Sequence, residues 1–319
     1  GTPSVVLATL GVIVTAGVVG AAAYVLVGMP LPLAMLLGAV VASTDAAATF
    51  MLIQQSGVPL RERVKQTLVL ESGLNDPVAI FLTVVLTVLV GSNSALDQAT
   101  ISSFVLMLLS QISFGMLGGI AGGRVLVTIM RRLDLPEGTY PAVAVAGALA
   151  IFSGTILIGG SGFLAAYLVG ITVRNRFDGP LERVVNFNEA LQWVSQMVLF
   201  LMLGLLVTPS DLVSEFWPAI VCASVLMFIA RPLAVWISVG AMGFSLKETT
   251  FLSWVGLRGA VPILLAIYPV VAPGPVTAEF FNIVFIIVAS SLMLQGWTIV
   301  PLGKLLKLAS TENKTLASE

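Results

Sequence analysis

The chain has 319 residues, of which 58% are hydrophobic and only 10% are charged, with a formal net charge of −1. Because soluble domains contain about 25% charged residues, this composition excludes a water-soluble globular protein and predicts an all-α polytopic membrane protein. The near-zero net charge gives no basis for nucleic-acid binding, the lack of histidine excludes histidine metal sites, and the single cysteine, Cys222, excludes an internal disulfide.

Ten apolar segments are expected to cross the bilayer, which takes about 20 residues of helix. In chain order they are 4–27, 31–54, 67–90, 103–130, 140–157, 161–174, 189–207, 216–237, 248–270 and 278–302. The short fifth and sixth segments are separated only by the sequence IGGSG. The chain begins without methionine, so we expect further sequence upstream.

Charges in the connections predict an orientation. Every second connection is basic, with Arg61, Arg63, Lys65, Arg131, Arg132, Arg174, Arg176, Arg183, Lys247, Lys304 and Lys307. The alternate connections carry the acids Asp97, Asp211, Glu215 and Glu279 and no lysine or arginine. Because cytoplasmic connections are enriched in Lys and Arg, ten spans predict that both ends of this segment are cytoplasmic.

The first and last three spans share a pattern. The middle span is interrupted by VASTDAAAT in the first triplet and by VGLRGAVPI in the last. Asp45 and Asp76 are 31 residues apart, and Ser290 lies 31 residues after Gly259. Because the two triplets enter the membrane from opposite sides, we predict an inverted-repeat transporter fold with two discontinuous, crossing helices. The alternative is that the glycines only permit close helix packing.

Two carboxylates, Glu71 and Asp76, lie inside one apolar span, where a charge costs roughly 2.5–3.5 kcal/mol. On a helix they point about 140° apart, so they need different partners. Ser72 and Asn75 share the face of Asp76. Burial disfavours a charged carboxylate, so Asp76 is expected to hold either a proton or a cation, which is the basis of exchange. The alternative is a structural Asp76 locked to an arginine.

Glu71 fits a structural ion pair better. Arg231, in FIARPLAVW, is an isolated charge in another apolar run, and Arg258 is the competing partner. The ends of interrupted helices carry partial charges, which Asp45 and Arg258 are placed to balance. Gln295 is expected to make an ordinary interhelical hydrogen bond.

Together these motifs carry a family resemblance. The chain resembles the bacterial NhaP-type monovalent cation/proton antiporters, and its motifs are most similar to those of the potassium/proton branch. The motifs are, in this order, TDAAATF, ESGLNDPVAIFLT, IARPL and GLRGAVPI. The resemblance runs over nearly the whole chain. It implies no cofactor and an ion site built from Asp76, Asn75, Asp45, Thr44 and Ser72, with the monovalent cation (K⁺ favoured, Na⁺ possible) at Asp76, Asp45 and Thr44.

The resemblance also implies a Glu71–Arg231 pair, electroneutral exchange because Asn75 precedes the carrier acid, and a homodimer in the bacterial inner membrane. Its fold divides the chain into a core (1–91 and 208–303), linking and interface helices (92–207) and a polar tail (304–319) that precedes a cytosolic regulatory domain. Two departures are that Ala46 replaces a common proline and that the family's upstream helices are absent here.

Other classes fit the residues less well. An intramembrane aspartyl protease needs Gly-x-Gly-Asp, which surrounds neither Asp45 nor Asp76, and a rhomboid-like protease needs a histidine. An enzyme is therefore not expected. A cation channel remains an alternative, because polar interrupted helices also line pores. A sodium-coupled solute carrier of related architecture is the other alternative.

Overall fold

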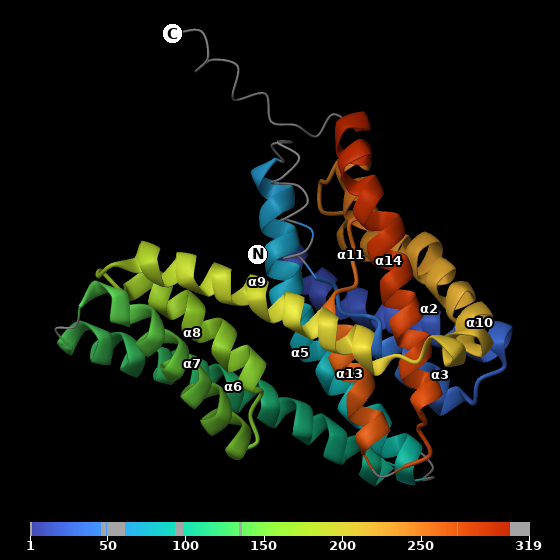
Figure 1. Cartoon of the computed structure of the whole chain (residues 1–319), viewed down its shortest axis with the longest axis horizontal. Helices are drawn as coiled ribbons and strands as arrows, with labels where there is room; N and C mark the ends of the chain where they lie inside the picture. The colour runs from blue at the N-terminus through green and yellow to red at the C-terminus, as the bar shows by residue number, and fades with distance from the viewer. Residues whose placement is uncertain are drawn as a thin grey trace, which may run out of the picture. The chain divides into compact units, whose positions relative to one another are not determined.

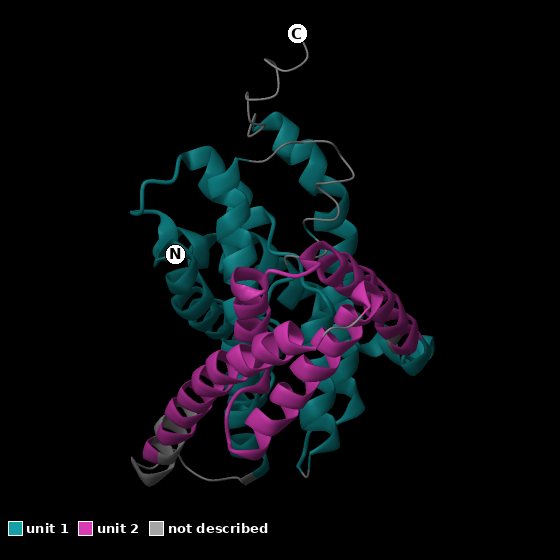
Figure 2. Ribbon diagram, turned by 90° about the vertical axis from the view of Figure 1, so that its left-hand side faces the viewer, with its two compact units in different colours: residues 1–93, 205–319 teal, residues 94–204 magenta. Residues whose placement is uncertain are grey.

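The structure, a computed structural model, describes residues 2–45, 49, 61–92, 98–133, 136–272 and 274–306. These residues form helices and connecting turns, and no strand occurs among them (Figure 1). The chain divides into two compact units: unit 1 comprises residues 1–93 and 205–319, and unit 2 comprises residues 94–204 (Figure 2). The predictions that concern Asp97, Lys307 and most of 46–54 lie outside the described residues.

Unit 1 begins with a helical span over 2–27 that contains no charged residue. Its successive segments are α1 (Thr2–Val6), η1 (Leu7–Gly11), α2 (Val12–Ala22) and η2 (Ala23–Val27), where η1 and η2 are π-helical turns. Helix α3 (Leu31–Val40) packs against α2, and α5 (Glu62–Ser92) packs against α3. Although Pro77 lies within α5, the helix runs on past it.

The second part of unit 1 repeats this order of a span, an interrupted helix and a span. The first span is formed by η4 (Pro209–Asp211), α10 (Leu212–Val225), the π-helical turn η5 (Leu226–Ala230) and α11 (Arg231–Val239). The interrupted helix is α12 (Leu246–Trp254) followed by α13 (Ala260–Val271), and the last span is α14 (Ala278–Leu305).

The two interruptions lie against one another inside unit 1. Helix α3 ends at Val40 and α12 ends at Trp254, and both are followed by non-helical backbone. The Asp45 backbone N–H donates to the Leu257 carbonyl at 2.8 Å, which joins the two unwound stretches directly. An apolar cluster from η1, α5, α11, α12 and α14 includes Leu7, Leu68, Val235, Phe251 and Ile299, and it packs beside the second interruption. The described residues thus bring the end of the first interrupted helix against the break of the second, as the predicted crossing requires.

Unit 2 contains α6 (Gln98–Arg132), η3 (Glu137–Thr139), α7 (Tyr140–Leu157), α8 (Gly162–Arg176) and most of α9 (Leu181–Leu206). Glycines along α6 let α7 and α8 approach closely, as small residues do between membrane helices. For example, a Cβ at Gly122 would lie 2.8 Å from the Ile151 side chain. Leu126, Met130, Val169 and Val173 belong to the buried core of this unit.

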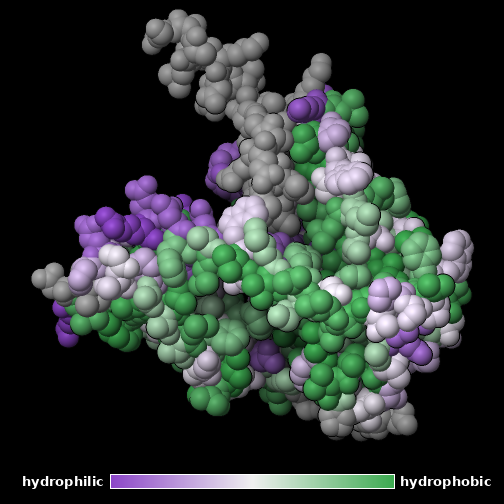
Figure 3. All heavy atoms as spheres, in the orientation of Figure 1, coloured by the Kyte–Doolittle hydropathy of each residue, from purple (hydrophilic) through white to green (hydrophobic). Residues whose placement is uncertain are grey.

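Seven helices of the described part are long and apolar enough to cross a membrane. The three other predicted spans correspond to α3, to α12 with α13, and to α8, which are interrupted or shorter. Hydrophobic residues cover most of the visible helix flanks, and hydrophilic ones gather at helix ends, as expected for helices that face lipid (Figure 3). The all-helical membrane fold is thus confirmed.

Candidate functional site

The first interruption meets α5 at a cluster of hydroxyl, amide and carboxylate groups. The Ser43 hydroxyl donates to Asp76 Oδ1, and Asn75 Nδ2 donates to Thr44 Oγ1 at 2.6 Å. The Thr44 hydroxyl also lies 3.5 Å from the Ser72 hydroxyl. Residues after Val40 leave the helix, so their side chains turn toward the α5 face that carries Asn75 and Asp76. The result is an oxygen-rich site within an apolar unit.

Asn75 adds an unsatisfied oxygen to this site. Its side chain is fully buried, and its Oδ1 atom has no hydrogen-bond partner in the described part of the chain. A buried amide oxygen without a partner is costly, because it has lost its hydrogen bonds to water. Amide, hydroxyl and carboxylate oxygens are also the groups that replace the hydration shell of a monovalent cation. The arrangement around Asp76 is therefore chemically suited to such an ion.

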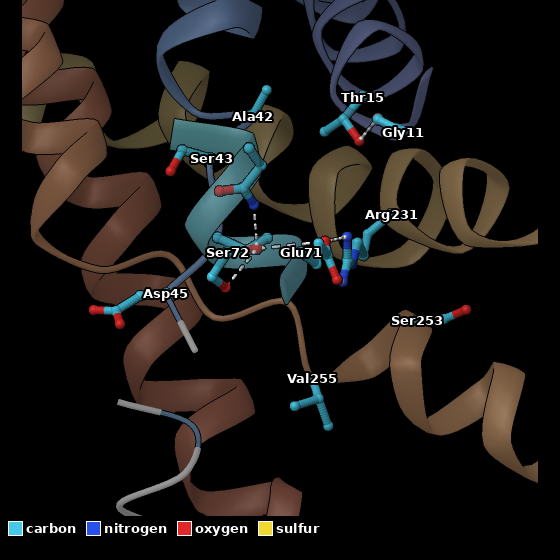
Figure 4. Close-up of polar contacts among 12 residues, drawn as sticks. Gly11, Thr15, Ala42, Ser43, Asp45, Glu71, Ser72, Arg231, Ser253 and Val255 are labelled. Atoms are coloured by element: carbon cyan, nitrogen blue, oxygen red, sulfur yellow. Dashed lines mark hydrogen bonds and ion pairs between the residues drawn. The ribbon is translucent and has the colours of Figure 1, made fainter. Parts of the chain in front are cut away.

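Glu71 lies at the edge of this cluster, where its Oε1 accepts from Thr44 Oγ1 at 3.4 Å, and it is neutralised by Arg231. The two side chains are 2% and 4% exposed, and they form two parallel hydrogen bonds of 2.5 and 3.0 Å. In Figure 4 this pair lies on the right, with Asp45 on the left, away from it. A bidentate arginine–carboxylate pair is the strongest common geometry for such a contact. The structure therefore pairs Glu71 with Arg231 and not with Arg258.

Arg258 instead serves the end of the other interrupted helix. Its side chain is 1% exposed, and Nη1 donates to the carbonyls of Ala42 and Ser43 at 2.6 and 2.7 Å. These carbonyls follow the carboxyl end of α3, where the helix dipole is negative. Arg258, which lies in the second interruption, therefore balances the partial negative charge at the first interruption. It does so without forming an ion pair with Asp76.

Glycine at two positions makes this crossing possible. A Cβ at Gly256 would lie 2.6 Å from Arg231 Nε, and a Cβ at Gly259 would overlap the carboxylate of Asp45. Asp45 is half-buried, and its backbone carbonyl accepts from Thr49 Oγ1 at 3.1 Å. Any larger residue at Gly259 would force the two interruptions apart.

Two polar residues of α14 support the second interruption in a way that the sequence alone did not reveal. The Ser291 hydroxyl accepts from the Arg258 backbone N–H at 3.2 Å and donates to Gln295 Oε1 at 2.5 Å. Gln295 Nε2 donates in turn to the Trp254 carbonyl, the last of α12, at 2.8 Å. Gln295 therefore links both ends of the break that contains Arg258. The sequence signals were the repeat spacing, which led to Ser290 beside Ser291, and the interhelical hydrogen bond expected of Gln295, which is confirmed.

Of the residues predicted for the ion site, the structure brings Asp76, Asn75, Thr44 and Ser72 into one cluster, and Thr44 also lies 3.4 Å from Glu71 Oε1. Asp45 is on the same unwound segment as Thr44 and contacts the second interruption through its backbone. Ser43, which holds Asp76, was not among the predicted site residues.

Residues 1–305 match the sodium/hydrogen exchanger transmembrane family. The chain belongs to this family. The match extends through both interrupted helices and all the residues of the site.

The individual relatives of this chain are named as cation/proton antiporters. The chain is 44% identical over 306 residues to the K⁺/H⁺ antiporter NhaP of Alkalimonas amylolytica, and 40% identical over 307 residues to the K⁺/H⁺ antiporter NhaP2 of a Shewanella species. Each comparison covers 96% of this chain and 53% of the relative, so the chain spans about half the length of these relatives. It is 29% identical to the Na⁺/H⁺ antiporter NhaH of Halobacillus aidingensis, covering 95% of this chain and 76% of that protein.

Among solved structures, the sodium proton antiporter MjNhaP1 from Methanocaldococcus jannaschii is similar, with a TM-score of 0.78 and 23% identity. The similarity covers 95% of this chain and 79% of that one. It shows that the chain has the inverted-repeat fold of that structure.

Proposed function

We propose that the full-length protein is a secondary transporter, and not an enzyme, that exchanges a monovalent cation for a proton by alternating access. Asp76 is the group that binds the cation or the proton in turn. The observation that carries this proposal is the charge balance of α5. Glu71 is neutralised by Arg231, whereas Asp76 has a serine hydroxyl, and no cationic side chain, as its partner in the described part of the chain.

A buried carboxylate without a cationic side chain is costly when ionised, so it must bind a proton or an external cation. The two ligands compete for the same oxygens. Exchange follows when each ligand is picked up on one side of the membrane and released on the other. The carbonyl-compensating role of Arg258 supports this mechanism, because it leaves the Asp76 carboxylate available to the ion.

The stoichiometry follows from the neighbour of Asp76. Asn75 is neutral, so α5 offers one exchangeable carboxylate, and one monovalent cation replaces one proton at Asp76 while Asp45 keeps the same charge throughout. The exchange is then electroneutral. We favour K⁺ because the relatives at 40–44% identity are named K⁺/H⁺ antiporters, with Na⁺ as the second candidate. Thr44 and Asp45 contribute to holding the cation with Asp76.

The same proposal assigns the parts of the chain. Segments 1–91 and 208–303 form the transport core, 92–207 forms the linking and interface helices of a homodimer, and 304–319 leads toward a cytosolic regulatory region. We place both ends of the segment in the cytoplasm of a bacterial inner membrane, because the basic connections lie on that side. Cysteine labelling from each side of the membrane at positions 65 and 279 tests this orientation.

The experiment that tests the function uses the full-length protein in proteoliposomes with an imposed pH gradient. K⁺, Na⁺, Li⁺ or choline is added outside while the internal pH is recorded. Dissipation of the gradient by K⁺ but not by choline, with no change when the membrane voltage is clamped, is expected for electroneutral exchange. Cation movement that needs no counter-moving proton would instead indicate a channel and overturn the proposal.

A further inference from the structure

Unit 1 has an open groove that the exchange mechanism does not use. It has a volume of about 620 Å³, within the roughly 300–1,000 Å³ typical of ligand sites. Its walls come from α11, α12 and α14 and include Trp236, Thr250, Trp254, Thr298 and Leu305. Figure 1 shows α11 and α14 near one another. Trp236 is 55% exposed and Leu305 is 77% exposed, so the groove opens onto the surface of membrane-spanning helices.

The hydroxyl groups and the Trp254 indole of the wall are already bonded inside the protein. Trp254 Nε1 donates to Thr298 Oγ1, and the Thr250 hydroxyl donates to the Leu246 carbonyl, each at 2.8 Å. The Thr298 hydroxyl donates to the Leu294 carbonyl at 2.7 Å. What the groove presents to an occupant is therefore hydrocarbon and aromatic surface. Such a wall is complementary to an alkyl chain and not to a polar solute.

Two lysines, Lys247 and Lys304, lie near one end of the groove. Lys247, Thr250 and Trp254 share one face of α12, because they are spaced by three and four residues. Lys304 directly precedes Leu305 at the end of α14. Both lysines are exposed, and neither forms an ion pair within the described residues. Both lysines belong to basic connections that the proposed orientation puts on the same, cytoplasmic side of the membrane, and the Trp254–Thr298 bond joins α12 to α14 beside the groove.

We propose that this groove binds an anionic phospholipid, with an acyl chain along Trp236 and Trp254 and the headgroup phosphate at Lys247 and Lys304. The charge complementarity of the two lysines selects an anionic over a zwitterionic lipid. Trp254 is the last residue of α12, and its carbonyl is held by Gln295, which also supports Arg258 through Ser291. This part of the inference rests on the proposed exchange: the bound lipid stabilises the second interruption, whose Arg258 balances the partial negative charge after α3 beside the ion site.

The test is a binding measurement that does not depend on transport. Full-length protein that keeps Trp236 and Trp254, the two tryptophans of the groove, and no other tryptophan is reconstituted in vesicles that contain brominated phosphatidylglycerol or brominated phosphatidylcholine at equal bromine content. Bromine quenches tryptophan fluorescence on contact. We expect stronger quenching of these groove tryptophans, of which Trp236 is the exposed one, by the anionic lipid. A protein with Trp297 alone is the matched control, because Trp297 is 83% exposed but does not line the groove, and both lipids should quench it equally.

The Lys247→Gln/Lys304→Gln double variant should lose the excess quenching of the groove tryptophans, whereas Lys65→Gln, an exposed lysine at the start of α5, should keep it. Equal quenching of the groove tryptophans by the two lipids, or an anionic preference that survives in the double variant, would overturn the proposal. Because binding is read without ion flux, a protein that fails to exchange cations can still pass this test.

Discussion

Substituting Arg231→Ala should destabilise the protein strongly, because it leaves the Glu71 carboxylate charged, buried and without a counter-charge. Both side chains are almost completely buried, and both guanidinium nitrogens that face Glu71 donate to it. Removing one partner of such a pair costs roughly 3–5 kcal/mol, since the remaining ion keeps its desolvation penalty and loses its attraction.

The assay is thermal unfolding of the full-length protein in detergent. In a domain of 150–250 residues a loss of 1 kcal/mol lowers Tm by roughly 2–4 °C. The expected decrease for Arg231→Ala is therefore on the order of 10 °C. A Glu71→Gln/Arg231→Met double variant, which removes both charges and keeps most of the side-chain volume, should recover most of this loss.

The matched control is Arg183→Ala. Arg183 pairs with Glu137 at 2.8 Å, but these side chains are 61% and 64% exposed. Exposed pairs contribute at most about 1 kcal/mol, so this variant should melt close to the wild type. If Arg231→Ala were no less stable than Arg183→Ala, the buried pair would not have the structural role that its geometry indicates.

Three further outcomes are expected. Gly259→Ala should abolish exchange, because its Cβ would overlap the Asp45 carboxylate, while Gly17→Ala, which meets nothing within 4 Å, should transport normally in the same flux assay. Gln295→Leu should lower the free energy of unfolding by roughly 1–3 kcal/mol, because it strands the buried Trp254 carbonyl; unchanged denaturant midpoints would contradict this. Finally, proton and cation compete for one carboxylate, so the apparent KM for the cation should rise as pH falls, and a KM that is independent of pH would exclude a shared site.

Much of the fold can be predicted from this sequence because the membrane imposes strong constraints. Apolar runs of about 20 residues mark spans, and a polar residue inside such a run is conspicuous. VASTDAAAT and VGLRGAVPI therefore indicate both interrupted helices from sequence alone. The short α8, by contrast, follows α7 after only a few residues, so its separation from α7 depended on the weak signal of IGGSG.

The pairing of charges could not be predicted with the same certainty. Glu71 had two candidate arginines, and only the three-dimensional arrangement places Arg231 opposite its carboxylate while Arg258 reaches the carbonyls after α3. Ser43 was missed for a related reason, and for Gln295 the predicted interhelical hydrogen bond is confirmed but its partner, the Trp254 carbonyl, was not foreseen. A serine or glutamine in a membrane helix is usually an ordinary interhelical donor, and its special partner becomes apparent only when the unwound backbone is in place.

The measurement that tests the central claim most directly compares wild type and Asp76→Asn in the cation-driven proton-flux assay. Asparagine keeps the size of the side chain and an oxygen that can accept from Ser43, so folding should be preserved, and the melting temperature verifies this. The account predicts that K⁺ no longer dissipates the pH gradient in the variant, because a neutral amide takes up no proton and so cannot exchange a proton for a cation. Normal K⁺-driven proton flux by a well-folded Asp76→Asn protein would contradict it.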